Sequence, residues 1–459
     1  MTSAELEHTD EGYRHALSNR QVQMIAIGGA IGVGLFLGAG GRLAAAGPAL
    51  VFAYAGAGVA AFFVMRALGE LVLYRPTSGS FVEYARTFIG PWAGFASGWM
   101  YWVNWAATGG AELTAIATYI AKWAPAVPQW ITALVTLLVV LAVNLVSVRL
   151  FGELEFWFAM LKVLAIVTFL VVGTVLVLLS AGTAPANLVQ HGGLFPNGFP
   201  VVLMSLQAVV FAYASIELVG VAAGETRDPA RVMPRAVNSV VWRIAIFYVG
   251  SVLLLVMVLP WTAYSADESP FVTVFAHLGV PGAADVMNLI VITAALSSCN
   301  SGLYSTGRIL RAMAMRGEAP AVTARLSSRQ VPHGGIAFTA VVLMGGVALN
   351  YFVPRQAFDI ATAVASLGVV TTWGTLVFCQ MRLREAALRG ELVRPAFRMP
   401  GSPYTNWLTL GFLALVVLLM AVADDAQRIA FLLIPLLVAA IAVGWRVVSR
   451  RRARNPLTR

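Results

Sequence analysis

Four glycines near the start of the chain interrupt a segment that is otherwise apolar enough to cross a bilayer. They are Gly28, Gly29, Gly32 and Gly34, within residues 26–36. Each glycine costs a helix about 1 kcal/mol relative to alanine, so we expect the helix to break here. Broken backbone inside a membrane is tolerated only where it is buried in protein or lines a cavity. The freed groups are therefore predicted to bind a ligand, although glycines also let two helices pack closely.

The predicted break leaves a half-helix whose first N–H groups point into the gap. The N-terminus of a helix carries roughly +0.5 elementary charge, which suits a carboxylate. We expect a binding site for a carboxylate group to be formed by Ala30, Ile31, Gly32, Val33 and Gly34. Backbone carbonyls of the same segment are expected to contribute to binding an ammonium group.

A second irregular patch lies in a later apolar segment. The residues expected to face a ligand there are Phe211, Ala212 and Tyr213, through unwound carbonyl groups, and Ser215 and Glu217 just beyond them. A carboxylate at membrane depth costs about 3 kcal/mol on insertion scales, so Glu217 is expected to have a function. It either contacts a substrate or a proton, or it holds the break open through hydrogen bonds.

Polar side chains also recur at helical spacing within apolar segments. Thr108 and Glu112 follow Asn104 at intervals of four residues, which places all three on one helix face. Asn300 lies beside a similar stripe of serines. Such stripes face the interior of a helix bundle, where Thr108, Glu112 and Asn300 either contact substrate or form hydrogen bonds between helices.

Lys162 is one of two lysines in the chain and lies within an apolar segment. A buried lysine releases its proton far more readily than an arginine, so Lys162 is a candidate for proton coupling, together with Glu217. The alternative is that Lys162 extends its ammonium group to the nearer membrane surface.

The elements that must position these residues are membrane-spanning helices. Only 11% of the 459 residues are charged, against about 25% in soluble domains. Apolar stretches long enough to span a bilayer predict an all-α membrane protein with twelve transmembrane helices. The predicted spans are 22–43, 50–73, 92–120, 130–148, 156–179, 201–223, 240–261, 286–313, 336–353, 360–380, 407–422 and 429–448.

The distribution of basic residues predicts the orientation of these spans. Of the 31 Lys and Arg, only Arg42, Lys122, Arg355 and Arg428 fall in one set of loops, and nearly all others fall in the opposite set. The positive-inside rule then places both termini in the cytoplasm, namely the polar tail 1–20 and the basic tail 449–459. The net charge of +10 is thus explained by basic residues in cytoplasmic loops, and no nucleic-acid partner is expected.

The two interrupted helices, the first and the sixth, predict an internal symmetry. Broken helices at corresponding positions of two halves are typical of inverted-repeat transporters with a site near the membrane midplane. We expect a transmembrane domain over 21–448 with repeats at about 21–180 and 200–380 and additional helices at 405–448. The five histidines are scattered and no P-loop is present, so neither a catalytic site, a metal site nor ATP-driven transport is expected.

Several motifs resemble those of the bacterial amino acid permeases of the amino acid–polyamine–organocation superfamily. They are residues 19–32, 65–70, 75–81, 90–94, 223–226 with Asp228-Pro229, and 300–304. The resemblance implies a five-plus-five inverted repeat, proton-driven symport without a bound cofactor, and α-amino acid binding at the two breaks. It also implies that Lys162 occupies the lysine position of the fifth span.

Further motifs resemble the branch of this family that carries L-asparagine. They are residues 11–13, 214–217, 307–311 and 313–315. The resemblance implies import of L-asparagine across the bacterial cytoplasmic membrane. Glycine or alanine, γ-aminobutyrate and cationic amino acids stay open as substrates, as does a sensor that does not transport. Val33 stands where many relatives have Thr or Ser, which affects fine selectivity more than backbone recognition.

Overall fold

The computed structural model describes residues 32–77, 80–146, 148–180, 182–218, 229–328 and 331–454. Regular structure within these ranges is helical throughout. Eight helical stretches there have the length and apolar composition needed to cross a membrane, and two apolar helices, Phe199–Ala212 and Tyr404–Met420, are shorter. The prediction of an all-helical membrane protein is confirmed.

The first part of the described chain contains α2 (Val33–Phe36), α3 (Gly38–Ala46), α4 (Leu50–Tyr74), α5 (Ser80–Phe88), α6 (Pro91–Ala121), α7 (Gln129–Val146), α8 (Val148–Leu179), α9 (Thr183–Ala186), α10 (Phe199–Met204) and α11 (Leu206–Ala212). The second part contains α13 (Pro229–Arg243), the π-helix η4 (Ile244–Gly250), α14 (Ser251–Val258), α15 (Pro270–His277), α16 (Ala283–Met315), α17 (His333–Phe352), α18 (Ala357–Leu388), α19 (Tyr404–Met420) and α20 (Asp425–Arg454).

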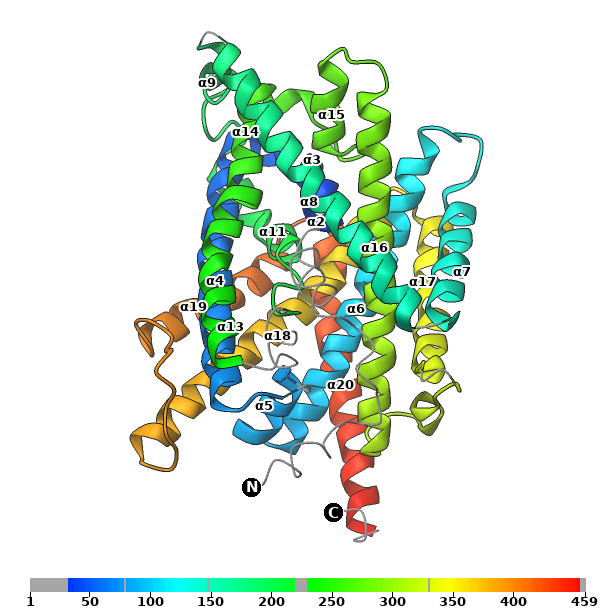
Figure 1. Cartoon of the computed structure of the whole chain (residues 1–459), viewed down its shortest axis with the longest axis vertical. Helices are drawn as coiled ribbons and strands as arrows, with labels where there is room; N and C mark the ends of the chain where they lie inside the picture. The colour runs from blue at the N-terminus through cyan, green and yellow to red at the C-terminus, as the bar shows by residue number, and fades with distance from the viewer. Residues whose placement is uncertain are drawn as a thin grey trace.

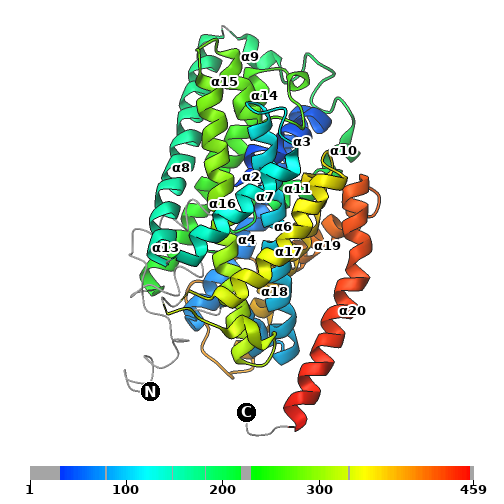
Figure 2. The same ribbon diagram turned by 90° about the vertical axis from the view of Figure 1, so that its right-hand side faces the viewer.

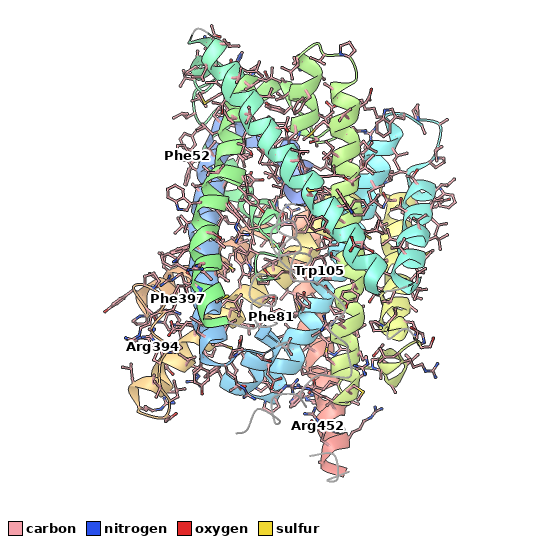
Figure 3. All side chains as sticks on the ribbon, viewed as in Figure 1. Phe52, Phe81, Trp105, Arg394, Phe397 and Arg452 are labelled. Atoms are coloured by element: carbon pink, nitrogen blue, oxygen red, sulfur yellow. The ribbon has the colours of Figure 1, made fainter. Side chains whose placement is uncertain are left out.

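Helices α6, α16 and α18 form the centre of the bundle, and α6 contacts both of the others (Figures 1 and 2). Small residues allow this close packing. A Cβ added to Gly302 of α16 would meet Trp105 Cε3 of α6 at 2.8 Å, and one added to Gly368 of α18 would meet the Met100 carbonyl oxygen at 2.8 Å. Figure 3 shows Trp105 at this central level. The polar stripe on α6 is therefore held rigidly inside the bundle.

A buried carboxylate ties three elements together at the lower end of the molecule in Figure 1. The Glu318 side chain is fully buried and accepts from Arg86 of α5 at 2.8 and 2.9 Å and from Arg452 of α20 at 2.6 Å. Arg452 is labelled at this end of the molecule in Figure 3. Helix α20 lies on the outside of the bundle (Figure 2).

The helix that carries Lys162 begins earlier than predicted. We expected the span to start at residue 156, but α8 begins at Val148. Lys162 thus lies 14 residues, about 21 Å, from the helix start rather than two turns from it. The predicted span 156–179 lies within α8 and nearly matches its apolar stretch Glu153–Leu179, and Glu155, just outside the predicted span, is buried and hydrogen-bonded. The Lys162 side chain is only 1% exposed.

Candidate substrate and proton site

The first described helix begins at the predicted break. Gly32 is extended (φ −130°, ψ −171°) and α2 starts at Val33. The N–H groups of Leu35 and Phe36 donate to the Gly32 carbonyl at 3.2 and 3.3 Å. The N–H groups of Val33 and Gly34 have no backbone acceptor among the residues that the structure describes. Ala30 and Ile31 lie outside the described residues.

The second break follows α11. The helix ends at Ala212, residues 213–217 form turns, and Ser215 has a positive φ of 73°. The Phe211 carbonyl accepts from the Ala214 N–H at 2.9 Å. The Phe211 carbonyl thus already accepts one hydrogen bond, and its predicted contact with a ligand through a second lone pair stays a prediction. The next two carbonyls, those of Ala212 and Tyr213, accept no hydrogen bond from a backbone N–H of the described residues.

The two breaks touch each other. A Cβ added to Gly34 would lie 2.7 Å from Ala212 Cα and 3.1 Å from Phe211 Cδ1. Gly34 and Ala212 therefore lie so close together that a residue with a side chain at position 34 would clash with Ala212. The start of α2 and the end of α11 are therefore in direct contact.

Tyr213 is part of the wall of this region rather than a flexible contact. Its side chain is fully buried, and its hydroxyl donates to the Tyr54 carbonyl at 2.9 Å. Its ring lies 4.5 Å from the ring of Tyr248, measured between centroids. The Tyr213 side chain is thus fixed to α4 and η4, and only its backbone is free to meet a ligand.

The stripe on α6 brings unpaired polar atoms to the same region. Glu112 Oε1 would be 3.8 Å from a Cβ on Gly32. Glu112 Oε2 and Thr108 Oγ1 are buried without a hydrogen-bond partner in the described structure. Buried polar atoms are normally paired, so such atoms beside two open helix ends indicate a place for a polar ligand.

Glu217 lies at the far end of the second break. Trp373 Nε1 of α18 donates to its Oε2 at 3.5 Å, while Oε1 is buried without a partner in the described structure. The carboxylate thus both fixes the turn to α18 and keeps one oxygen open. Both uses expected from the sequence are compatible with this arrangement. Ser215, 6% exposed, is buried in the same turn.

Two carboxylates interact with Lys162, and only one of them, Glu112, was predicted from the sequence as a site residue. Its electrostatic partners are Glu155 on its own helix and Glu112 on α6. Ser297 Oγ of α16 donates to Glu155 Oε1 at 2.7 Å. Glu155 was not predicted from the sequence, although its spacing of seven residues from Lys162 places both on one face of a helix.

Asn300 belongs to this second polar cluster. Its Oδ1 accepts from Asn144 Nδ2 of α7 at 2.8 Å, and its amide lies close to Glu155. The side chain is therefore engaged between helices on the α7–α8 side of α16. Its predicted role in substrate binding stays a prediction.

Charge pairs connect α3 to two later parts of the chain. Arg42 of α3 lies 3.3 Å from both Asp359 of α18 and Asp424, which lies between α19 and α20. Burial alone would raise the pKa of Asp424, but the Gln427 N–H and Arg42 together hold it below its usual value. The ion pairs thus fix the position of α3, and with it the N-terminus of α2.

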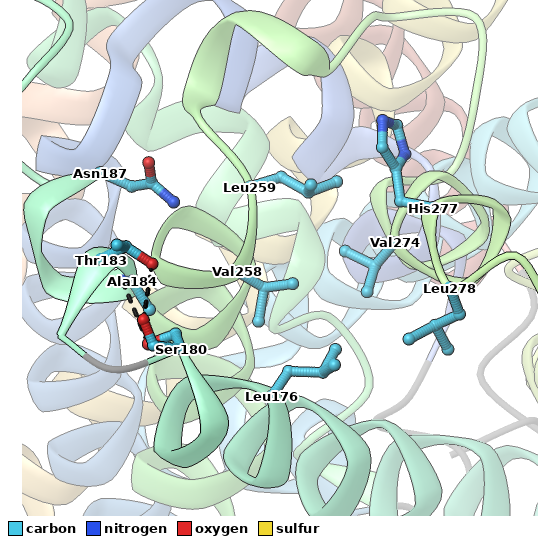
Figure 4. A pocket seen from close by; sticks show the side chains of 10 residues that line it. All are labelled: Leu176, Ser180, Thr183, Ala184, Asn187, Val258, Leu259, Val274, His277 and Leu278. Carbon is cyan, nitrogen blue, oxygen red and sulfur yellow. Dashed lines mark hydrogen bonds between the residues drawn. The ribbon is translucent and has the colours of Figure 1, made fainter.

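A surface pocket of about 230 Å³ lies elsewhere, where the upper ends of α8 and α14 meet α9 and α15 (Figure 4). Its polar groups bond within the protein. Asn187 Nδ2 donates to the Met257 carbonyl at 2.8 Å, and His277 Nδ1 lies 2.9 Å from the Thr273 carbonyl oxygen. This pocket shares no residue with the two breaks.

The helical membrane fold, with two open helix ends facing buried carboxylates, defines a transporter rather than an enzyme. Residues 21–457 match the family model described as "Amino acid permease". The chain therefore belongs to the amino acid permease family and is a multi-pass membrane protein.

Relatives of known name match almost the whole chain. Proteins named L-asparagine permease from Streptomyces coelicolor and Escherichia coli are 54% and 53% identical, over 97% of this chain and 92% and 90% of their own lengths. L-asparagine permease 1 of Mycobacterium tuberculosis is 54% identical over 96% of this chain and 92% of its own length.

Proposed function

We propose that this chain imports L-asparagine together with protons across the cytoplasmic membrane. The observation that carries the proposal is the contact of Gly34 with Ala212, which brings a helix start and a helix end together. An α-amino acid needs both, because it presents a carboxylate and an ammonium group on one carbon. The asparagine side chain is supported by the names of relatives that share more than half of the sequence.

In the proposed complex, the α-carboxylate accepts from the N–H groups of Val33 and Gly34, with Ile31 and Gly32 adjoining. The ammonium group donates to the carbonyls of Ala212 and Tyr213 and to that of Ala30. The side-chain amide has both donors and acceptors. We assign its recognition to Thr108, Glu112, Ser215, Glu217 and Asn300.

We propose the organisation of a five-plus-five inverted repeat. Its repeats cover about 21–180 and 200–380, within a domain of twelve spans over 21–448 that includes additional helices at 405–448. Both termini lie in the cytoplasm, as the Arg-rich loops favour. Rocking of the helices that carry the two breaks against the rest then exposes the site to each side in turn.

Uptake by purified protein in liposomes tests the substrate. We expect labelled L-asparagine to enter when the outside is more acidic, and unlabelled asparagine to compete better than glycine, alanine, γ-aminobutyrate or arginine. Liposomes without a pH gradient and liposomes without protein are the controls. If asparagine neither enters nor competes, another amino acid that does both replaces it as the substrate.

Lys162→Ala tests proton coupling. We expect the variant to lose uptake driven by the pH gradient, because the buried ammonium group that exchanges the proton is absent. Exchange of labelled for unlabelled substrate at equal pH needs no net proton movement and is expected to persist. Gradient-driven uptake at the wild-type rate would rule out this role of Lys162.

A further inference from the structure

Glu155 is a buried carboxylate that substrate recognition does not use. It is 1% exposed and precedes Lys162 by seven residues on α8. Seven residues bring two side chains to the same helix face, about 10 Å apart along the axis. Side chains on a helix lean toward its N-terminus, so Lys162 extends toward Glu155 rather than away from it.

The two carboxylate oxygens of Glu155 differ in their surroundings. Oε1 accepts from Ser297 Oγ at 2.7 Å, whereas Oε2 is buried without a hydrogen-bond partner in the described structure. Ser301 and Asn300 of α16 lie close to the same carboxylate. A purely structural anchor would have both oxygens satisfied, and Glu155 keeps one open.

Charge balance indicates that this group holds an exchangeable proton. Lys162 interacts electrostatically with both Glu155 and Glu112. Two ionised carboxylates and one ammonium group would leave one uncompensated negative charge in the bundle interior, which is costly. One additional proton, bound to either Glu112 or Glu155, neutralises that charge.

Other ionisable side chains on the packed elements are limited. Helices α7 and α14 have none, and η4 has Tyr248. On α16 they are Asp285, Cys299, Tyr304, Arg308 and Arg311. Burial disfavours the charged form of Glu155, and Lys162 is the charged side chain that opposes this effect.

Lys162 interacts with Glu112, which lies beside Gly32, and with Glu155, which is seven residues nearer to the start of α8. We propose that Glu155 receives the coupled proton from Lys162 and releases it to the cytoplasmic side. The proposal rests on the proposed function, which places the start of α8 at the cytoplasmic surface.

Each step of the proposed relay is a simple proton transfer. The Lys162 ammonium gives a proton to the Glu155 carboxylate, which leaves a neutral amine and a neutral carboxylic acid. Glu112, protonated from the site, then gives its proton to the Lys162 amine. Glu155 finally loses its proton to cytoplasmic water, and the net result is one proton moved from the substrate site to the cytoplasm.

Glu155→Gln in liposomes tests the relay, because the amide keeps an acceptor for Ser297 but carries no exchangeable acid proton. With labelled L-asparagine and an acidic exterior, we expect gradient-driven accumulation to fall about tenfold or more. Acidification of a pH-sensitive dye trapped inside is expected to fall in parallel. Exchange at equal pH is expected to stay within about twofold of wild type, since it needs binding and rocking only.

Two matched variants separate the relay from a loss of structure. Glu153→Gln removes another carboxylate from the same helix, and Ser297→Ala removes only the hydrogen bond, so both are expected to retain driven uptake. Glu155→Asp keeps a protonatable carboxylate and is expected to retain part of the acidification that the dye reports. If Glu155→Gln does not fold, the relay is tested with Glu155→Asp instead.

The relay would be overturned if Glu155→Gln accumulated asparagine and acidified the liposomes as well as wild type does. It would also be overturned if both Glu155 variants folded but lost driven uptake and exchange to the same extent. If wild-type protein does not carry asparagine, the substrate proposal fails on that result alone. The Glu155 comparison is then made with whichever panel amino acid the wild type carries.

Discussion

Gly34→Ala is expected to abolish most substrate uptake, because a single added carbon separates the two broken helices. The new Cβ would lie 2.7 Å from Ala212 Cα, and backbone atoms do not move aside as a flexible side chain does. Overpacking of this kind costs about 1–3 kcal/mol. If that cost falls on the substrate-binding state, uptake drops by about tenfold or more, since 1.4 kcal/mol corresponds to a factor of ten.

Gly345→Ala on α17 is the matched control. A Cβ at Gly345 meets nothing within 4 Å, and the residue lies inside a regular helix. We expect unchanged uptake and equal or higher thermal stability, because alanine is the better helix former by about 1 kcal/mol. Uptake and thermal unfolding of both variants would be measured side by side. Wild-type uptake by Gly34→Ala would contradict the contact between the two breaks.

Glu70→Ala is expected to cause the largest loss of stability. Glu70 of α4 is fully buried and accepts from Arg394 Nε at 2.5 Å, from Gln380 Nε2 at 2.9 Å and from the Met399 N–H at 2.8 Å. It thereby fixes the segment between α18 and α19 onto α4, at the place where Figure 3 labels Arg394 and Phe397. Removing one partner of a buried ion pair costs about 3–5 kcal/mol.

The chain offers a second Arg–Glu pair with nearly the same geometry but without burial. Arg389 donates to Glu391 at 2.5 and 3.1 Å, and both side chains are more than half exposed. We expect Glu391→Ala to leave the melting temperature in detergent unchanged, Glu70→Gln to lower it, and Glu70→Ala to lower it most. Equal effects of Glu70→Ala and Glu391→Ala would show that burial does not set the contribution of these pairs.

Local chain chemistry was sufficient to predict where the helices stop. The glycine run predicted the helix start that the structure places at Val33, and the irregular patch predicted the end of α11 at Ala212. Both features depend on backbone propensities of neighbouring residues, which a sequence displays directly. The buried position of Lys162 followed in the same way from its apolar surroundings.

Other features of the site depend on segments far apart in the chain. Whether a carbonyl already has a hydrogen-bond partner depends on the next turn, and the Phe211 carbonyl accepts from the Ala214 N–H. Glu155 accepts a hydrogen bond from Ser297, which is 142 positions away in the sequence. No local pattern contains that pairing, because its energy arises only when α8 and α16 are packed together.

By itself, the sequence determined that this protein is a helical membrane protein, and it predicted a helix start near Gly32 and a helix end near Ala212, because hydrophobic length and glycine content are local properties. The tertiary structure alone decided that Gly34 meets Ala212, and that Glu112, Lys162 and Glu155 share one buried region. The physical reason is that a charge or an open backbone group is tolerated inside a bundle only beside its partner. Packing of distant helices determines which partner that is.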